Sequence, residues 1–176
     1  MIQSVMTQSG ADIDLTGGKS FVEFIGLYNL RDVQLSPEFE RSVKDFGKVT
    51  LVVFADLECP DCLAVLPFLG KISYANPSIS VVFGEWNAQS EKFLQDRLGT
   101  ARVPTVLALD AAGKLMDGAF IERPLAVHRA AAGASSRKDA MLIVEKFRNG
   151  GADALIEEDL LKILNGAKIE VLRYLK

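Results

Sequence analysis

Two kinds of apolar spacing alternate along the middle of the chain. Nearly continuous apolar runs, typical of strands buried inside a sheet, occupy residues 49–55, 78–83, 103–109 and 114–121. Between them the apolar residues recur every three or four positions, which predicts a helix of several turns from Pro60 and another over 89–98. This order of strands and helices predicts an α/β fold with a central mixed sheet and helices on both faces.

Helical patterns also flank this central region. The capping-box sequence Ser20-Phe21-Val22-Glu23 predicts a helix over 20–31, and Ser36-Pro37 opens a second helix. Pro67 lies inside the helix that starts at Pro60, where we expect a kink.

The last fifty residues carry further helical signals. Helical segments are predicted around 130–132, 138–148 and 153–165, whereas 168–175 is ambiguous between strand and helix. We therefore expect three parts, namely a lead-in with a helix (1–35), an α/β core (36–124) and a helical extension packed on the core (125–176).

The composition of the chain limits the kinds of partner that we expect it to bind. Of the 176 residues, 49% are apolar, enough for a packed core, and a net charge of -3 provides no basic patch for nucleic acid or for a membrane surface. The N-terminus lacks a basic region followed by a long apolar stretch, and no segment approaches the length of a membrane span. We expect a cytoplasmic protein whose partner is another protein or a small thiol.

The two cysteines are the main candidate for chemistry. Cys59 and Cys62 stand three positions apart, a spacing suited to reversible redox chemistry and unsuited to stapling distant segments. Cys59 ends a strand and starts a helix, where free backbone amides and the helix dipole favour a thiolate. One helical turn later, Cys62 can attack a mixed disulfide on Cys59. We assign Cys59 as the nucleophile, more exposed than Cys62, the resolving thiol.

Acidic residues surround this pair. Asp56, Glu58 and Asp61 are expected to oppose a negative charge on Cys59, and so to raise its pKa and favour the disulfide. The expected redox potential is therefore on the reducing side.

The cysteine pair also allows two roles without redox chemistry. Both cysteines could be ordinary buried residues, or half of a zinc or iron-sulfur site completed by a second subunit or by a cofactor thiol. Because no further cysteine and only one histidine, His128, are present, we expect no metal and no cofactor. His128 is expected at the surface or at a helix cap, and Trp86 as packing that is partly buried.

Three stretches together resemble the thioredoxin superfamily over about 36–124: Val52 to Cys62 (VVFADLECPDC), Pro67, and Arg102-Val103-Pro104-Thr105. The resemblance implies a thioredoxin-like fold, a cis proline at Pro104 beside the cysteines, and substrate hydrogen bonds from the main chain of Val103. Pro60 and Asp61 complete the expected substrate contacts. The Cys-Pro-Asp-Cys center and the Ile121-Glu122-Arg123-Pro124 tail are most similar to bacterial thioredoxin-like proteins.

The sequence also departs from that family. Val53 stands where thioredoxin has a buried aspartate, Glu58 replaces the tryptophan before the first cysteine, and an apolar residue near Phe83 replaces a lysine. Glutaredoxin usually has a tyrosine at the position of Asp61 and a glycine pair that is absent after Pro104.

Three functions are therefore compared. The first is a thiol-disulfide oxidoreductase that acts on protein or small-molecule disulfides and is fed by a reductase or a low-molecular-weight thiol. The second is a thioredoxin-fold binding module with non-catalytic cysteines, and the third is a glutathione-linked, glutaredoxin-like protein.

Overall fold

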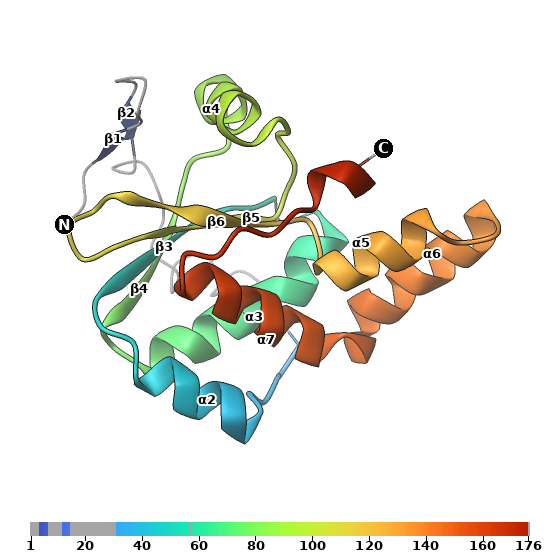
Figure 1. Ribbon diagram of the computed structural model, residues 1–176, viewed down its shortest axis with the longest axis horizontal. Helices are drawn as coiled ribbons and strands as arrows, with labels where there is room; N and C mark the ends of the chain where they lie inside the picture. The colour runs from blue at the N-terminus through green and yellow to red at the C-terminus, as the bar shows by residue number, and fades with distance from the viewer. Residues whose placement is uncertain (1–3, 7–11, 15–30, 57, 176) are drawn as a thin grey trace.

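A four-stranded mixed sheet forms the center of the computed structural model, which describes residues 4–6, 12–14, 31–56 and 58–175 (Figure 1). Its strands, in the spatial order β4-β3-β5-β6, are β3 (Val49–Phe54), β4 (Ile79–Phe83), β5 (Thr105–Leu109) and β6 (Leu115–Ile121). β3 runs parallel to β4, whereas β5 is antiparallel to both β3 and β6. The predicted mixed sheet is confirmed.

The central strand β3 is buried on both faces, which explains its continuous apolar sequence. All six of its residues are buried. Because successive side chains of a strand point to opposite faces, Leu51 and Val53 join one hydrophobic cluster while Val52 and Phe54 join the other.

Helices cover both faces of the sheet (Figure 1). The face of Leu51 and Val53 packs against α2 (Pro37–Lys44), α3 (Pro60–Ala75) and α7 (Asp153–Leu164). The opposite face packs against α4 (Ala88–Leu98), which also contacts a small hairpin of β1 (Ser4–Met6) and β2 (Asp12–Asp14). α3 continues as one helix through Pro67.

The C-terminal chain adds helices beyond the sheet. α5 (Leu125–Ala132) and α6 (Arg137–Lys146) lie side by side, and a kinked segment, η1 (Phe147–Gly151), then leads into α7. The ambiguous segment 168–175 is neither strand nor α-helix, and only a 3-10 turn, η2 (Leu172–Tyr174), is regular in it.

Two buried carboxylates of α7 hold the starts of other helices. The backbone N–H of Ser36, the N-cap of α2, donates to Glu157 Oε1 at 2.7 Å, and that of Leu125 at the start of α5 donates to Asp159 Oδ2 at 2.7 Å. A negative charge near a helix N-terminus is stabilised by the free amides and the helix dipole. α7 thereby fixes α2 and α5 against the core.

The end of α7 also approaches the sheet closely. A Cβ atom placed on Gly118 of β6 would collide with the backbone oxygen of Ala167, just after α7. Only glycine therefore leaves room for this contact.

Some predictions fall outside the described residues. The helix predicted over 20–31 is one of them, apart from Arg31, and the proposed division at residues 35 and 124 stays a prediction. In the described ranges, no helix is both long and apolar enough to cross a membrane.

Candidate active site

The two cysteines occupy the first turn of α3. Cys59 is the N-cap residue, with an extended backbone (φ -82°, ψ 113°), and it follows the loop that leaves β3. Cys59 is partly exposed, whereas Cys62 is completely buried. The predicted order of exposure is confirmed, so a substrate can reach Cys59 before Cys62.

The environment of Cys59 favours its thiolate. A hydrogen bond from the Cys62 thiol, assisted by the backbone N–H groups of Cys62 and Asp61, lowers the pKa of Cys59 to about 6, although burial opposes this change. The same contact with Cys59, together with burial, raises the pKa of Cys62. One thiol is therefore prepared to attack while the other keeps its proton.

This result corrects the expectation that acidic neighbours raise the pKa of Cys59. The Asp61 charge does oppose the thiolate, but its effect is weaker than that of the hydrogen bonds and is outweighed. The reducing potential inferred from the acidic residues loses that support, because a stabilised thiolate favours the reduced dithiol and makes a protein more oxidising.

Asp61 is buried and held by two arginines, whose positive charges lie beside its carboxylate. It is 2% exposed, and its Oδ2 accepts a hydrogen bond from Arg123 Nη2 at 2.7 Å. Its Oδ1 accepts another from Arg148 Nε at 2.5 Å. These two guanidinium groups compensate the carboxylate charge inside the protein. Substrate contact by Asp61 stays a prediction, one that this burial does not favour.

The other two acidic residues are exposed and belong to the loop before α3. Asp56 Oδ1 accepts a hydrogen bond from the backbone N–H of Glu58 at 2.9 Å, and the backbone oxygen of Asp56 accepts one from the N–H of Cys59 at 3.2 Å. Asp56 therefore shapes the turn that presents Cys59.

The peptide bond between Val103 and Pro104 is cis, as the resemblance implied. The Cys59 Sγ lies 3.6 Å from the backbone oxygen of Val103. β5 begins only at Thr105, after this bend, so it is shorter than the run predicted over 103–109. Cys59, the exposed Pro60 and the Val103-Pro104 bend form the candidate substrate platform.

Sequence analysis missed the charged residues that support this platform. Glu122 has a left-handed backbone (φ 62°), and its carboxylate pairs with Arg102 at 3.1 Å and Arg123 at 3.2 Å. Its backbone N–H also donates to the Pro104 oxygen at 2.7 Å. Arg123 already stood in the tail that resembles other proteins, but nothing in the sequence connects Arg148 with Asp61.

The position of His128 also differs from the prediction. It is 4% exposed, with Nε2 2.9 Å from the backbone oxygen of Ile121, because α5 turns this side chain toward the end of β6. Burial lowers its pKa. Trp86 is partly buried against the cluster on the α4 face, as expected for packing.

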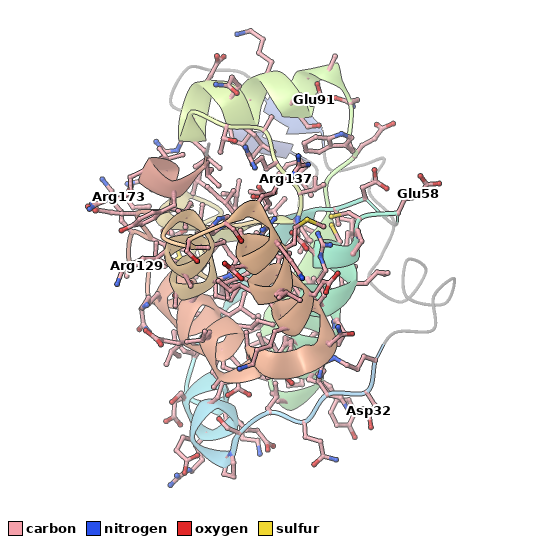
Figure 2. All side chains as sticks on the ribbon, turned by 90° about the vertical axis from the view of Figure 1, so that its right-hand side faces the viewer. Asp32, Glu58, Glu91, Arg129, Arg137 and Arg173 are labelled. Atoms are coloured by element: carbon pink, nitrogen blue, oxygen red, sulfur yellow. The ribbon has the colours of Figure 1, made fainter. Side chains whose placement is uncertain are left out.

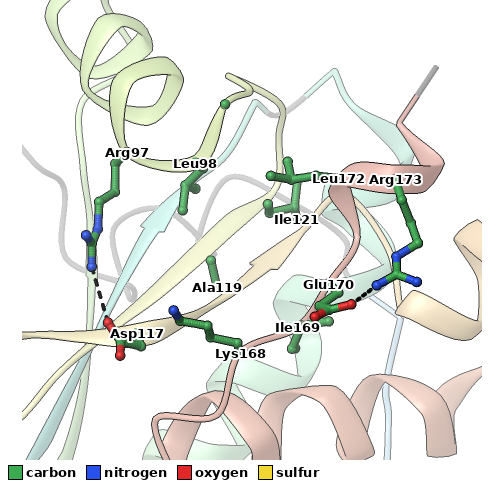
Figure 3. Close-up of a pocket in the computed structure, with 11 residues that line it drawn as sticks. Arg97, Leu98, Asp117, Ala119, Ile121, Lys168, Ile169, Glu170, Leu172 and Arg173 are labelled. Atoms are coloured by element: carbon green, nitrogen blue, oxygen red, sulfur yellow. Dashed lines mark ion pairs between the residues drawn. The ribbon is translucent and has the colours of Figure 1, made fainter.

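Two of the hollows on the described surface are large enough for a small ligand. One, of about 280 Å³, is lined by side chains that include Arg123, Arg137 and Arg148, so it adjoins the partners of Asp61. The other, of about 620 Å³, lies between α4 and the segment 168–173, with Ala119 and Ile121 on its floor (Figure 3). Its lining includes no residue of the cysteine motif.

Metal binding finds no support in the described part of the chain. It contains no group of three or more histidine, cysteine, aspartate or glutamate residues that could hold an ion.

The comparisons with known proteins agree with this fold. The solved structure of a Pseudomonas aeruginosa protein of unknown function, PA1234, superposes with a TM-score of 0.66 at 21% identity, covering 87% of this chain and 96% of that one. An HIV epitope scaffold superposes with a TM-score of 0.61 at 25% identity, covering 84% and 81%. No curated protein matches the sequence.

A family model described as thioredoxin matches residues 27–140. This match spans more than half of the chain and includes both cysteines and the cis proline. The fold is thus a thioredoxin-like α/β fold, and the chain belongs to the thioredoxin family.

Proposed function

We propose that the protein is a thiol-disulfide oxidoreductase in which Cys59 is the nucleophile and Cys62 the resolving thiol. The observation that carries the proposal is the asymmetry of the pair. Cys59 is accessible with a pKa lowered to about 6, whereas the Cys62 pKa is raised and its side chain is buried. Cysteines that only pack in a core are not expected to differ in this way in exposure and pKa.

The reaction follows from this asymmetry. The Cys59 thiolate attacks one sulfur of a substrate disulfide, so that a Cys59-substrate bond forms and the substrate S–S bond breaks, releasing one thiolate. Cys62 then loses its proton and attacks Cys59 Sγ, which forms the Cys59-Cys62 disulfide and releases the second substrate thiolate. Two protons complete the substrate thiols, and the substrate gains two electrons.

The Val103-Pro104 bend is the place where we expect the substrate to bind. Its Val103 oxygen lies 3.6 Å from the reacting sulfur, so an extended chain bound along this bend would bring its disulfide to Cys59. A reductase or two molecules of a low-molecular-weight thiol would return the two electrons, and the cytoplasm is the compartment in which we place this cycle.

The alternative of a binding module rests on Val53, an apolar residue at the position where thioredoxin has a buried aspartate. Val53 is 0% exposed and offers no proton acceptor to the resolving thiol. A module of this kind would bind its partner along the Val103-Pro104 bend whether or not the cysteines can react.

Reduction of insulin by dithiothreitol tests the proposal. We expect the wild type to accelerate precipitation of the insulin chains and Cys59→Ser to abolish the acceleration. Cys62→Ser is the matched control, because it retains the nucleophile; incubated with insulin in the absence of dithiothreitol, it should accumulate a mixed disulfide that is visible on a non-reducing gel. Equal rates for wild type and Cys59→Ser would refute the oxidoreductase and favour the binding module.

A further inference from the structure

We propose that the arginine cleft, defined by Arg123, Arg137 and Arg148, binds a carboxylate of the disulfide substrate, so that the protein prefers disulfides with a neighbouring acidic group. The inference rests on the proposed function and names the chemical class of its substrate. The cleft has a volume of about 280 Å³.

The three guanidinium groups have hydrogen-bond donors to spare. Arg148 donates to Asp61 through Nε, and neither of its terminal nitrogens bonds to another described residue. Arg123 uses only Nη2, and its Nε is buried without a partner in the described part of the chain. Arg137 has no ion pair within the described ranges. A buried donor without a partner is costly, and a bound carboxylate would supply acceptors to these groups.

The charges of the cleft leave room for one anion. Arg123, Arg137 and Arg148 face Glu145 on the wall of the cleft and the buried carboxylate of Asp61. Arg123 also pairs with Glu122, a carboxylate that it shares with Arg102. With this pair counted, four arginines face three carboxylates, which leaves one positive charge. Guanidinium groups bind carboxylates in a planar, bidentate geometry, which makes an acidic side chain a fitting occupant.

The cleft is connected through Asp61 to the first turn of α3. Two of its arginines bond to Asp61, which lies between Pro60 and Cys62 in the first turn of α3. The third, Arg137, is exposed at the start of α6, on the end of the molecule that Figure 2 presents to the viewer. An anion bound here would lie beside the turn that carries both thiols.

Apolar side chains complete the walls. Met141 and Val144 line the cleft, and Met141 is 56% exposed on α6. They would contact the aliphatic part of a glutamate side chain while its carboxylate meets the arginines. The bound acid orients the substrate only, so the bonds made and broken at Cys59 are those of the proposed reaction.

Matched peptide disulfides test the inference. Two peptides that differ only in having glutamate or glutamine beside the disulfide are each reduced by the full-length protein with dithiothreitol as electron donor, and oxidised glutathione, a small disulfide with carboxylates, forms a third arm. We expect kcat/KM to be about 5-fold higher for the glutamate peptide, as for a partly exposed ion pair, and lower at high salt. If salt and Arg137→Gln affect the reduction of oxidised glutathione alone, the carboxylate that the cleft binds belongs to a small disulfide.

A substitution of Arg137 tests the cleft without disturbing the reactive pair, because Arg137 does not bond to Asp61. Arg137→Gln should reduce the preference for glutamate about 3-fold, and Arg137→Lys should retain most of it. Arg41→Gln, the same change on the exposed face of α2, should leave the preference as in the wild type.

The outcomes distinguish the two proposals. Reduction of both peptides at equal rates, without a response to salt or to Arg137→Gln, overturns the arginine cleft and leaves the oxidoreductase intact. Absence of Cys59-dependent exchange with all three disulfides, together with inactivity toward insulin, overturns both.

Discussion

The hydrogen bond between the two thiols can be removed with little change in the size of the site. Cys62→Ala deletes the donor, whereas Cys62→Ser keeps a donor in nearly the same volume. Hydrogen bonds to a charged group contribute about 1.5–3 kcal/mol, which corresponds to a rise of about 1–2 units in the Cys59 pKa. From a pKa of about 6, Cys59 is roughly nine-tenths thiolate at pH 7, and Cys62→Ala should lower this to between about one-tenth and one-half.

The assay is the rate of iodoacetamide alkylation measured from pH 4 to 10, or the absorbance of the thiolate near 240 nm measured up to about pH 8.5, below the range in which tyrosines ionise. Cys59 is the only thiol in either variant, so each curve has one midpoint. We expect the midpoint of Cys62→Ser to lie near that of the wild-type nucleophile and the midpoint of Cys62→Ala to lie above it. Equal midpoints in the two variants would refute the view that the Cys62 donor sets the Cys59 pKa, leaving the backbone amides as its cause.

Three further predictions concern stability. Arg148→Gln leaves Asp61 Oδ1 without its partner and should lower the free energy of unfolding, measured in urea, by about 1–3 kcal/mol. The control Arg41→Gln, at an exposed position, should change it by less than about 0.5 kcal/mol. Equal losses in the two variants would contradict a stabilising role of the buried Arg148–Asp61 pair. Gly118→Ala should lower the free energy of unfolding by about 1–3 kcal/mol, because the added methyl group collides with Ala167. Gly47→Ala is the control and should change it little, because the added methyl group meets no atom within 4 Å. An unchanged stability of Gly118→Ala would argue against the close contact. Because burial lowers the His128 pKa, the unfolded chain binds more protons than the folded chain, and stability falls as the pH drops below about 6.5. His128→Gln should therefore reduce the fall in thermal midpoint between pH 7 and pH 5. An unchanged fall would show that other groups cause it.

The local patterns of the sequence were sufficient for the sheet and for the reactive pair. The apolar run of β3 can be satisfied only by burial on both faces, and this burial implies a mixed or parallel sheet covered by helices. Likewise, a cysteine that follows such a strand and precedes Pro60 must stand at a helix N-terminus, where its thiolate is stabilised. These conclusions depend on neighbours within a few residues, which the sequence displays directly.

The charge balance of the site was decided only by the tertiary structure. Asp61 is one residue before Cys62 in the chain, so the sequence shows a negative charge beside a thiolate, but Arg123 and Arg148 lie 62 and 87 residues further on. Their positions depend on how β6 ends and how η1 packs against α3. The sequence by itself thus determined which residues can react and where the strand passes into the helix. The tertiary structure decided their electrostatics, because Coulomb interactions act through space and a carboxylate buried with two guanidinium groups no longer acts as an uncompensated charge.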